Sequence, residues 1–240
     1  MKIVAIIPAR LGSTRLPRKM LREIGGLPLI GRVYQAVRSS PLLADVIIAT
    51  DSTEILRVCE GAGWAACMTA EAHSSGTERV HEVAQAISAD VYINVQGDEP
   101  MTRPEHIAAL VELMKLPHVE VGTLKTPAAA AEIGNPNAVK VVTDRDGRAL
   151  YFSRAAIPYN RDGADTRYYK HLGFYAYRKS ALDRFVLLPG STLDKSERLE
   201  QLRFLENGIP IYLAETLFDS IGVDTEEDVL RVQQVLNEQG

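Results

Sequence analysis

A cluster of cationic side chains follows the first apolar segment of the sequence. The loop over residues 10–19 carries four positive groups and two hydroxyls: Arg10, Arg15, Arg18, Lys19, Ser13 and Thr14. The chain as a whole has a formal net charge of −4. A loop with this many positive groups is most simply explained by a polyanionic ligand, whose phosphate oxygens accept charge-assisted hydrogen bonds from Lys and Arg. A solvated basic loop is the alternative.

The segment before the loop predicts where these cations lie in the fold. Residues 3–7 are apolar and mostly β-branched, which is typical of a strand buried on both faces of a parallel sheet. Open α/β sheets bind their ligands at the carboxyl ends of the strands, so we expect a ligand at this loop. The loop contains neither G-x-x-x-x-G-K-[ST] nor G-x-G-x-x-G, which excludes a P-loop and a dinucleotide fingerprint.

Acidic residues follow a second predicted strand. A strand is expected at residues 90–95 (DVYINV), which lead directly into Gln96, Gly97, Asp98 and Glu99. A carboxylate at the carboxyl end of a parallel strand, on the same sheet edge as the basic loop, is well placed to hold Mg²⁺ against phosphates. A simple turn is the alternative reading of these residues. Asp224 precedes the last predicted helix, where it could be only a helix-entry residue.

A hydroxyl-rich segment opens the helix predicted at residues 80–87. The segment HSSGTER spans residues 73–79 and includes Thr77 and Arg79. Free backbone N–H groups at such a helix start suit an anion or the polar edge of a base. Alternatively, Thr77 only caps the helix.

Strands and helices alternate along the first half of the chain, which predicts a parallel α/β sheet. Helices are expected at residues 28–39, 55–60 and 104–116, with Asp51 and Glu54 capping the second of them. Later helices are expected at 180–186, 193–205 and 226–236, the last with a Thr225–Asp228 capping box. We expect one domain, with a nucleotide-binding core at 1–126 and 206–240 and a smaller lobe at 127–205.

The smaller lobe is expected to be antiparallel and to bind sugar or form a dimer. Turn residues 144–147 join the strands of a hairpin at 138–143 and 148–153, and a third strand is expected at 171–178. The aromatic residues of this lobe are Tyr151, Phe152, Phe174 and Tyr175. They form either a homodimer interface or part of the lobe's own core.

Composition excludes several classes of function. A chain of 240 residues can bury a substantial core without disulfides or metals. Cys59 and Cys67 have no zinc or C-x-x-C spacing, which favours reduced thiols in a cytoplasmic protein. No apolar run is long enough to span a membrane, and the mildly acidic composition argues against nucleic-acid binding.

Several motifs together give the chain a family resemblance. The loop reads P-A-R-x-x-S-x-R-L-P-x-K, and VQGDEP, SGTER, NPNAVK, YFSRA, HLG-x-Y, LEQLR and GVDT follow in order along the chain. This set resembles the 3-deoxy-manno-octulosonate cytidylyltransferases, or CMP-Kdo synthetases. The resemblance covers essentially the whole chain, whereas the CMP-sialic acid synthetases share the first loop only. One departure is Arg18-Lys19-Met20, where the family usually has Gly-Lys-Pro.

The resemblance implies an α/β fold of the nucleotidyltransferase type, GT-A or Rossmann-like, with a mostly parallel open sheet and helices on both faces. It implies transfer of CMP from CTP to the anomeric hydroxyl of Kdo, with release of pyrophosphate, for lipopolysaccharide or related glycan synthesis. A cytoplasmic homodimer is expected.

The resemblance also assigns roles to residues. Mg²⁺ would be held by Asp98 and Asp224, and these act in catalysis with Arg10 and Lys19. CTP would contact Arg10, Ser13, Arg15, Lys19, Thr77, Arg79 and Gln96. The sugar acid would contact Arg154, His171, Tyr175, Glu200 and Gln201.

Three alternatives stay open at this point. The acid could be another ulosonic acid, of the amino-Kdo or sialic acid type. Asp98 and Glu99 could instead hold the metal of a GT-A glycosyltransferase, which would release a nucleoside mono- or diphosphate rather than pyrophosphate. The third alternative is a nucleotide-binding module without turnover.

Overall fold

The computed structural model describes residues 1–13, 15–163 and 165–239, and it divides into two compact units. The first unit contains residues 1–108 and 220–240, and the second contains residues 109–219. Helix α4 (Pro104–Met114) begins in the first and ends in the second. Thr14, one of the two loop hydroxyls, lies outside the described residues.

The first unit is built around a parallel sheet with strand order β6–β1–β4–β5. Its strands are β1 (Ile3–Ala9), β4 (Asp45–Thr50), β5 (Ala66–Met68) and β6 (Val91–Val95). All neighbouring strands in this order are parallel, and β1 and β6 are buried along their whole length. The predicted parallel sheet is therefore confirmed. A short hairpin of β2 (Glu23–Ile24) and β3 (Leu27–Pro28) was not predicted.

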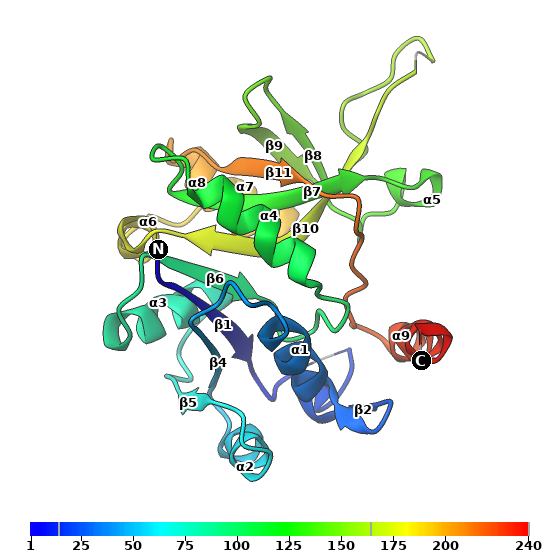
Figure 1. Ribbon diagram of the computed structural model, residues 1–240. Helices are drawn as coiled ribbons and strands as arrows, with labels where there is room; N and C mark the ends of the chain where they lie inside the picture. The colour runs from blue at the N-terminus through cyan, green and yellow to red at the C-terminus, as the bar shows by residue number, and fades with distance from the viewer. Residues whose placement is uncertain (14, 164, 240) are drawn as a thin grey trace. The chain divides into compact units, whose positions relative to one another are not determined.

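Helices cover both faces of this sheet. They are the 3₁₀ helix η1 (Lys19–Leu21), α1 (Leu29–Arg38), α2 (Thr53–Gly61), α3 (Gly76–Ala86) and α9 (Glu226–Gln239). Helix α1 contacts β1 and β4, while α3 contacts β1, β4 and β6. In Figure 1, α1 lies in front of these strands and α3 lies behind them.

Two predicted helix caps are wrong. Ser52, not Asp51, caps α2: its backbone is extended and its hydroxyl accepts a hydrogen bond from Ile55 N–H at 3.3 Å. Ser75, not Thr77, caps α3 in the same way. The sequence offers several capping residues in a row, and only the one whose backbone turns extended can cap.

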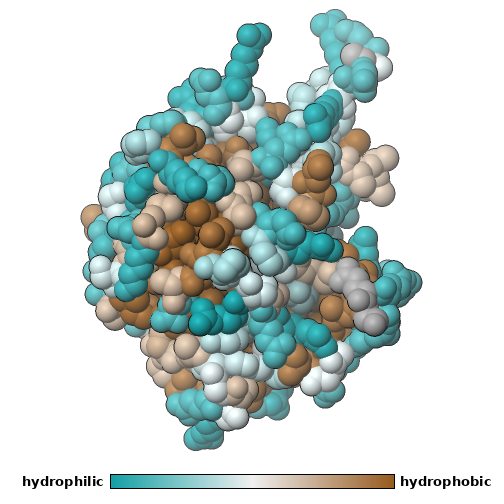
Figure 2. Space-filling model, in the orientation of Figure 1, coloured by the Kyte–Doolittle hydropathy of each residue, from teal (hydrophilic) through white to brown (hydrophobic). Residues whose placement is uncertain are grey.

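The second unit contains mainly antiparallel pairs. Its strands are β7 (Val121–Pro127), β8 (Lys140–Thr143), β9 (Ala149–Ser153), β10 (Tyr169–Tyr177) and β11 (Tyr212–Glu215). β7 pairs antiparallel with β10 and parallel with β11, and β8 pairs antiparallel with β9. The predicted hairpin is thus present. The turn of this hairpin and the segment between β9 and β10 present mainly hydrophilic side chains (Figure 2).

The helix predicted at residues 193–205 is interrupted. The helices of this unit are α5 (Ala130–Ile133), α6 (Lys179–Phe185), α7 (Thr192–Glu197) and α8 (Leu202–Glu206). Arg198, at the end of α7, has the left-handed backbone angles φ 52° and ψ 52°, which end a right-handed helix. This turn separates Glu200 and Gln201 from α7.

Three of the four aromatic residues named for the predicted lobe are buried. Phe152, Phe174 and Tyr175 belong to the core of the chain, which was the alternative to a dimer interface, whereas Tyr151 is half-buried. Among the described residues, no helix is both long and apolar enough to cross a membrane.

Candidate active site

The first unit contains a cavity of about 720 Å³ at the carboxyl ends of β1 and β6. Its lining includes six of the residues that the resemblance assigned to CTP, namely Arg10, Ser13, Arg15, Lys19, Arg79 and Gln96, and both of those assigned to Mg²⁺, Asp98 and Asp224. Segments far apart in the sequence thus meet at one edge of the parallel sheet, where ligands of open α/β sheets bind. Thr77 is fully buried and does not line the cavity, although its neighbour Gly76 does.

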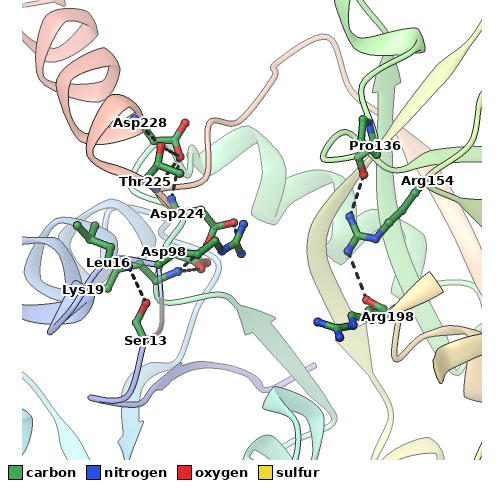
Figure 3. A network of polar contacts seen from close by, with 11 residues as sticks. Ser13, Leu16, Lys19, Asp98, Pro136, Arg154, Arg198, Asp224, Thr225 and Asp228 are labelled. Carbon is green, nitrogen blue, oxygen red and sulfur yellow. Dashed lines mark hydrogen bonds and ion pairs between the residues drawn. The ribbon is translucent and has the colours of Figure 1, made fainter. Parts of the chain in front are cut away.

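Lys19 lies between the two aspartates that were assigned to the metal (Figure 3). Its Nζ is 2.5 Å from an oxygen of Asp98 and 3.0 Å from an oxygen of Asp224, and Arg15 approaches Asp224 to 2.9 Å. Burial alone would lower the pKa of Lys19, but the two carboxylates outweigh burial and raise it. Lys19 therefore stays charged at neutral pH.

Backbone packing brings the two aspartates together. A Cβ at Gly97 would lie 2.7 Å from the Pro8 carbonyl oxygen, so only glycine allows β1 and β6 to end so close to each other. Val223 N–H donates to the Asp98 carbonyl at 2.8 Å, which fixes the segment before α9 beside the end of β6. The predicted Thr225–Asp228 capping box is present and starts α9 directly after Asp224.

Arg18 explains how the loop accommodates its departure from the family pattern. Its backbone is left-handed, with φ 55° and ψ 34°, at a position where the family usually has glycine. A non-glycine residue in this conformation costs roughly 1–2 kcal/mol. The Arg18 guanidinium forms an ion pair with Glu54, and the next residue, Lys19, still enters the cavity.

We expect Arg18→Gly to be more stable than Arg18→Ala by about 0.5–1 kcal/mol, the left-handed penalty less the extra backbone entropy of glycine. Both variants lose the ion pair with Glu54, so their difference isolates the backbone. Urea unfolding of the two proteins measures it. If the alanine variant is equally stable, Arg18 is not strained.

Arg79, which the resemblance assigned to CTP, is held by partners within the chain. It is 3% exposed, and its guanidinium lies 2.7 Å from Asp51 and also bonds the hydroxyl of Thr69. Arg79 forms part of the cavity wall, where it joins α3 to the ends of β4 and β5. By contrast, no ion pair within the described residues involves Arg10, which is exposed at the cavity.

In the second unit, backbone carbonyls hold Arg154 (Figure 3). Its guanidinium donates to the carbonyl of Glu197 at 2.7 Å, of Pro136 at 2.9 Å and of Arg198 at 3.4 Å. In the part of the chain that the structure describes, no carboxylate forms an ion pair with it. Its charge is thus fixed in place but not neutralised, as binding of an external carboxylate requires.

Glu197 is a residue that the sequence analysis missed. Its carboxylate accepts the Ser153 hydroxyl at 2.6 Å and the Arg154 backbone N–H at 2.9 Å. Its backbone carbonyl receives the guanidinium of the same arginine. The sequence offered little to identify it. Glu197 lies three residues before Glu200, and helix periodicity does not distinguish it from the other polar residues of this segment.

We expect Glu197→Ala to raise KM for the acid that binds Arg154 by about tenfold, because the arginine loses its backbone anchor. KM for the nucleotide should not change. The KM of Glu197→Gln for the acid should lie between those of this variant and the wild type, because glutamine keeps one acceptor oxygen. Glu206→Ala is the control, since that carboxylate bonds Ser191, Thr192 and Leu193 at the start of α7 rather than Arg154. Equal effects of both alanine variants on KM would contradict a positioning role.

The other residues assigned to the sugar acid cluster on β10 and at the turn before α8. The His171 and Tyr175 rings lie 5.4 Å apart, and the His171 ring also meets Phe152 edge-on at 5.0 Å. Burial, with a further contribution from Glu200, raises the pKa of Tyr175 well above its ordinary value.

Two buried polar atoms of this cluster are available to a ligand. Within the described residues, the Tyr175 hydroxyl and the Gln201 amide nitrogen make no hydrogen bond of good geometry. Leaving such a group unsatisfied costs about 1–3 kcal/mol. A polar ligand that reaches these atoms would remove this cost.

The residues of the first unit fit a divalent cation. Carboxylate oxygens of Asp98 and Asp224, from separate segments, already converge on one cationic group, the Lys19 ammonium. Mg²⁺ is commonly bound by one or two carboxylates together with substrate phosphates. Within the described ranges, no group of three or more acidic, His or Cys side chains forms a cage for a metal. The pair therefore suits a metal that arrives with its phosphates.

The fold and this cavity define the class of the protein, an α/β nucleotidyltransferase. Residues 4–216 match the sequence profile of the cytidylyltransferase family. The 3-deoxy-manno-octulosonate cytidylyltransferase of Koribacter versatilis is 63% identical over 98% of this chain and 90% of its own length. The protein of the same name from Acidobacterium capsulatum is 57% identical over 99% and 98%.

A solved structure agrees with these relatives. The CMP:2-keto-3-deoxy-manno-octonic acid synthetase complexed with CTP has a TM-score of 0.96 to this chain, with 41% identity over 100% of both chains. This chain belongs to the cytidylyltransferase family and, within it, to the 3-deoxy-manno-octulosonate cytidylyltransferases.

Proposed function

We propose that the protein transfers CMP from CTP to the anomeric hydroxyl of 3-deoxy-D-manno-octulosonate, releasing pyrophosphate. The observation that carries this proposal is the cavity in which Arg10, Arg15 and Lys19 meet Asp98 and Asp224. The names of the relatives and the CTP complex of the matched structure support the choice of nucleotide and acid.

The cavity residues have separate tasks in this reaction. Arg10, Ser13, Arg15 and Lys19 would bind the triphosphate through charge-assisted hydrogen bonds. Lys19 also offsets the negative charge of the two aspartates, which would otherwise repel the phosphates. The carbohydrate hydroxyl attacks the α-phosphorus, the bond from this phosphorus to the bridging oxygen breaks, and pyrophosphate leaves with these cations beside it.

Asp98 and Asp224 would hold Mg²⁺, as their convergence supports. Bound there, the cation would lower the pKa of the attacking hydroxyl and offset phosphate charge. Gln96, beside Gly76 at the cavity wall, would contact the nucleoside. Thr77 is buried behind this wall, so we expect it to act through packing.

The second unit would bind the acid. Arg154 offers an uncompensated guanidinium to the carboxylate, while Tyr175 and Gln201 offer buried polar atoms to hydroxyl groups. His171 and Glu200 complete this group of residues. A homodimer in the cytoplasm, where CTP is available, is part of the proposal and is supported by the family resemblance. The buried aromatic residues of the lobe give it no support.

Pyrophosphate release from four nucleoside triphosphates and several acids tests the proposal. We expect the highest kcat/KM with CTP and 3-deoxy-D-manno-octulosonate, and lower values with its 8-amino analogue and with sialic acid. A glycosyltransferase would give a nucleoside mono- or diphosphate instead. CTP binding without pyrophosphate release would indicate a binding module.

A further inference from the structure

Thr123, on β7, makes a set of contacts that fixes the direction of its hydroxyl proton. Its Oγ1 lies 2.7 Å from the Phe174 carbonyl oxygen, 3.3 Å from the Leu172 carbonyl oxygen and 3.1 Å from Nε2 of His171. Thr123 is fully buried. The Phe174 carbonyl can only accept, and its distance of 2.7 Å is that of an O–H···O hydrogen bond, so the single hydroxyl proton points at this carbonyl.

These contacts leave one assignment for the imidazole. Because the Thr123 proton points at a carbonyl, its oxygen can only accept from the ring, so Nε2 of His171 must carry a hydrogen. Burial lowers the pKa of His171 to about 3, so the ring is neutral at pH 7 and holds only one N–H. Nδ1 therefore has a free lone pair. In the described part of the chain, no hydrogen-bond donor reaches it.

The local irregularity of β10 explains why Thr123 has these neighbours. Leu172 pairs with Leu124 and Tyr175 pairs with Thr123, so Gly173 and Phe174 lie opposite no residue of β7. Such a bulge interrupts the ladder of backbone hydrogen bonds and changes the direction of the groups beside it. The Thr123 hydroxyl thereby reaches the Phe174 carbonyl and, with a lone pair, the imidazole.

We propose that Thr123 is a positioning residue that holds His171 as its Nε2–H tautomer, so that Nδ1 accepts a hydrogen bond from a hydroxyl group of the bound sugar acid. This rests on the proposed function for the identity of the ligand, but not for the tautomer. A tautomer with Nδ1–H would present a donor instead of an acceptor at this nitrogen and would repel the same hydroxyl proton. Thr123 thus determines that this position of the site accepts a hydrogen bond from the ligand rather than donating one.

Long-range ¹H–¹⁵N correlation spectra of protein labelled at its five histidines test this directly. The His171 signals are assigned from their loss in His171→Asn. We expect the Nε2–H pattern in the wild type and in Thr123→Ser, and a mixed or Nδ1–H pattern in Thr123→Val. Addition of 3-deoxy-D-manno-octulosonate should shift the Nδ1 resonance of the wild type.

Kinetics give the second readout. Thr123→Val should raise KM for the acid about tenfold, the loss expected for one neutral hydrogen bond, with KM for CTP unchanged and Thr123→Ser close to wild type. A wild-type Nδ1–H pattern overturns the proposal, even if Thr123→Val does not fold. The proposal is also overturned if a saturating concentration of the sugar acid does not shift the Nδ1 resonance of His171. If the protein releases no pyrophosphate with any acid, the proposed function fails, whereas the tautomer is still read from the spectra.

Discussion

Asp98→Asn and Asp224→Asn should each lower kcat for pyrophosphate release by about 10²–10³-fold or more. The change removes a negative ligand from the pair that converges on Lys19, at distances of 2.5 Å and 3.0 Å. A metal that polarises a phosphoryl oxygen contributes several kcal/mol, and each 1.36 kcal/mol is a factor of ten in rate. Initial rates at saturating CTP and acid measure the effect.

A second readout separates loss of the metal from loss of the fold. Titration of Mn²⁺ by electron paramagnetic resonance, with CTP present, should show weaker binding in both variants. Asp146→Asn is the matched control, because Asp146 is exposed in the turn between β8 and β9. Folded Asp98→Asn protein with a near-normal rate would remove this aspartate from the active site.

Arg154→Ala should raise KM for the sugar acid by about 30–100-fold and leave KM for CTP within twofold of the wild-type value. The guanidinium is held by three carbonyls, so its charge is available to a carboxylate. A charge-assisted hydrogen bond contributes about 1.5–3 kcal/mol, and an arginine that binds a carboxylate through two bonds lies at the upper end. Steady-state kinetics with each substrate varied in turn measure both constants.

Two further variants test how Arg154 acts. Arg154→Lys keeps the charge but loses the planar pair of donors, so its KM should lie between those of wild type and Arg154→Ala. Arg148→Ala removes an exposed arginine of the same unit that pairs only locally with Asp144, and it should change neither constant. A rise in KM for CTP alone would instead assign Arg154 to the nucleotide.

The order of strands and helices in the first unit could be predicted from the sequence, because that signal is local. Residues 3–7 form a continuous apolar run and residues 91–95 are apolar except for Asn94, and burial on both faces of a parallel sheet is the physical cause of such runs. The same reasoning located the cavity, since strand ends of one direction meet at one edge. It therefore placed the loop and Asp98 together.

Pairings between distant residues could not be predicted in this way. The guanidinium of Arg79 bonds Asp51, and nothing in the local pattern around Arg79 shows this pairing. The break at Arg198 was missed for a similar reason. Residues 193–205 have helical periodicity, but the αL turn places the carbonyls of Glu197 and Arg198 on Arg154.

The sequence by itself determined the fold class, the family and the cationic loop of the nucleotide site, because apolar periodicity and short motifs are properties of neighbouring residues. The tertiary structure alone decided which charged side chains are already paired with groups of the chain itself. It places Lys19 between Asp98 and Asp224, holds Arg154 on backbone carbonyls and sets the imidazole of His171 against Thr123. Hydrogen bonds and ion pairs depend on distances of a few ångströms, and only the folded chain sets those distances.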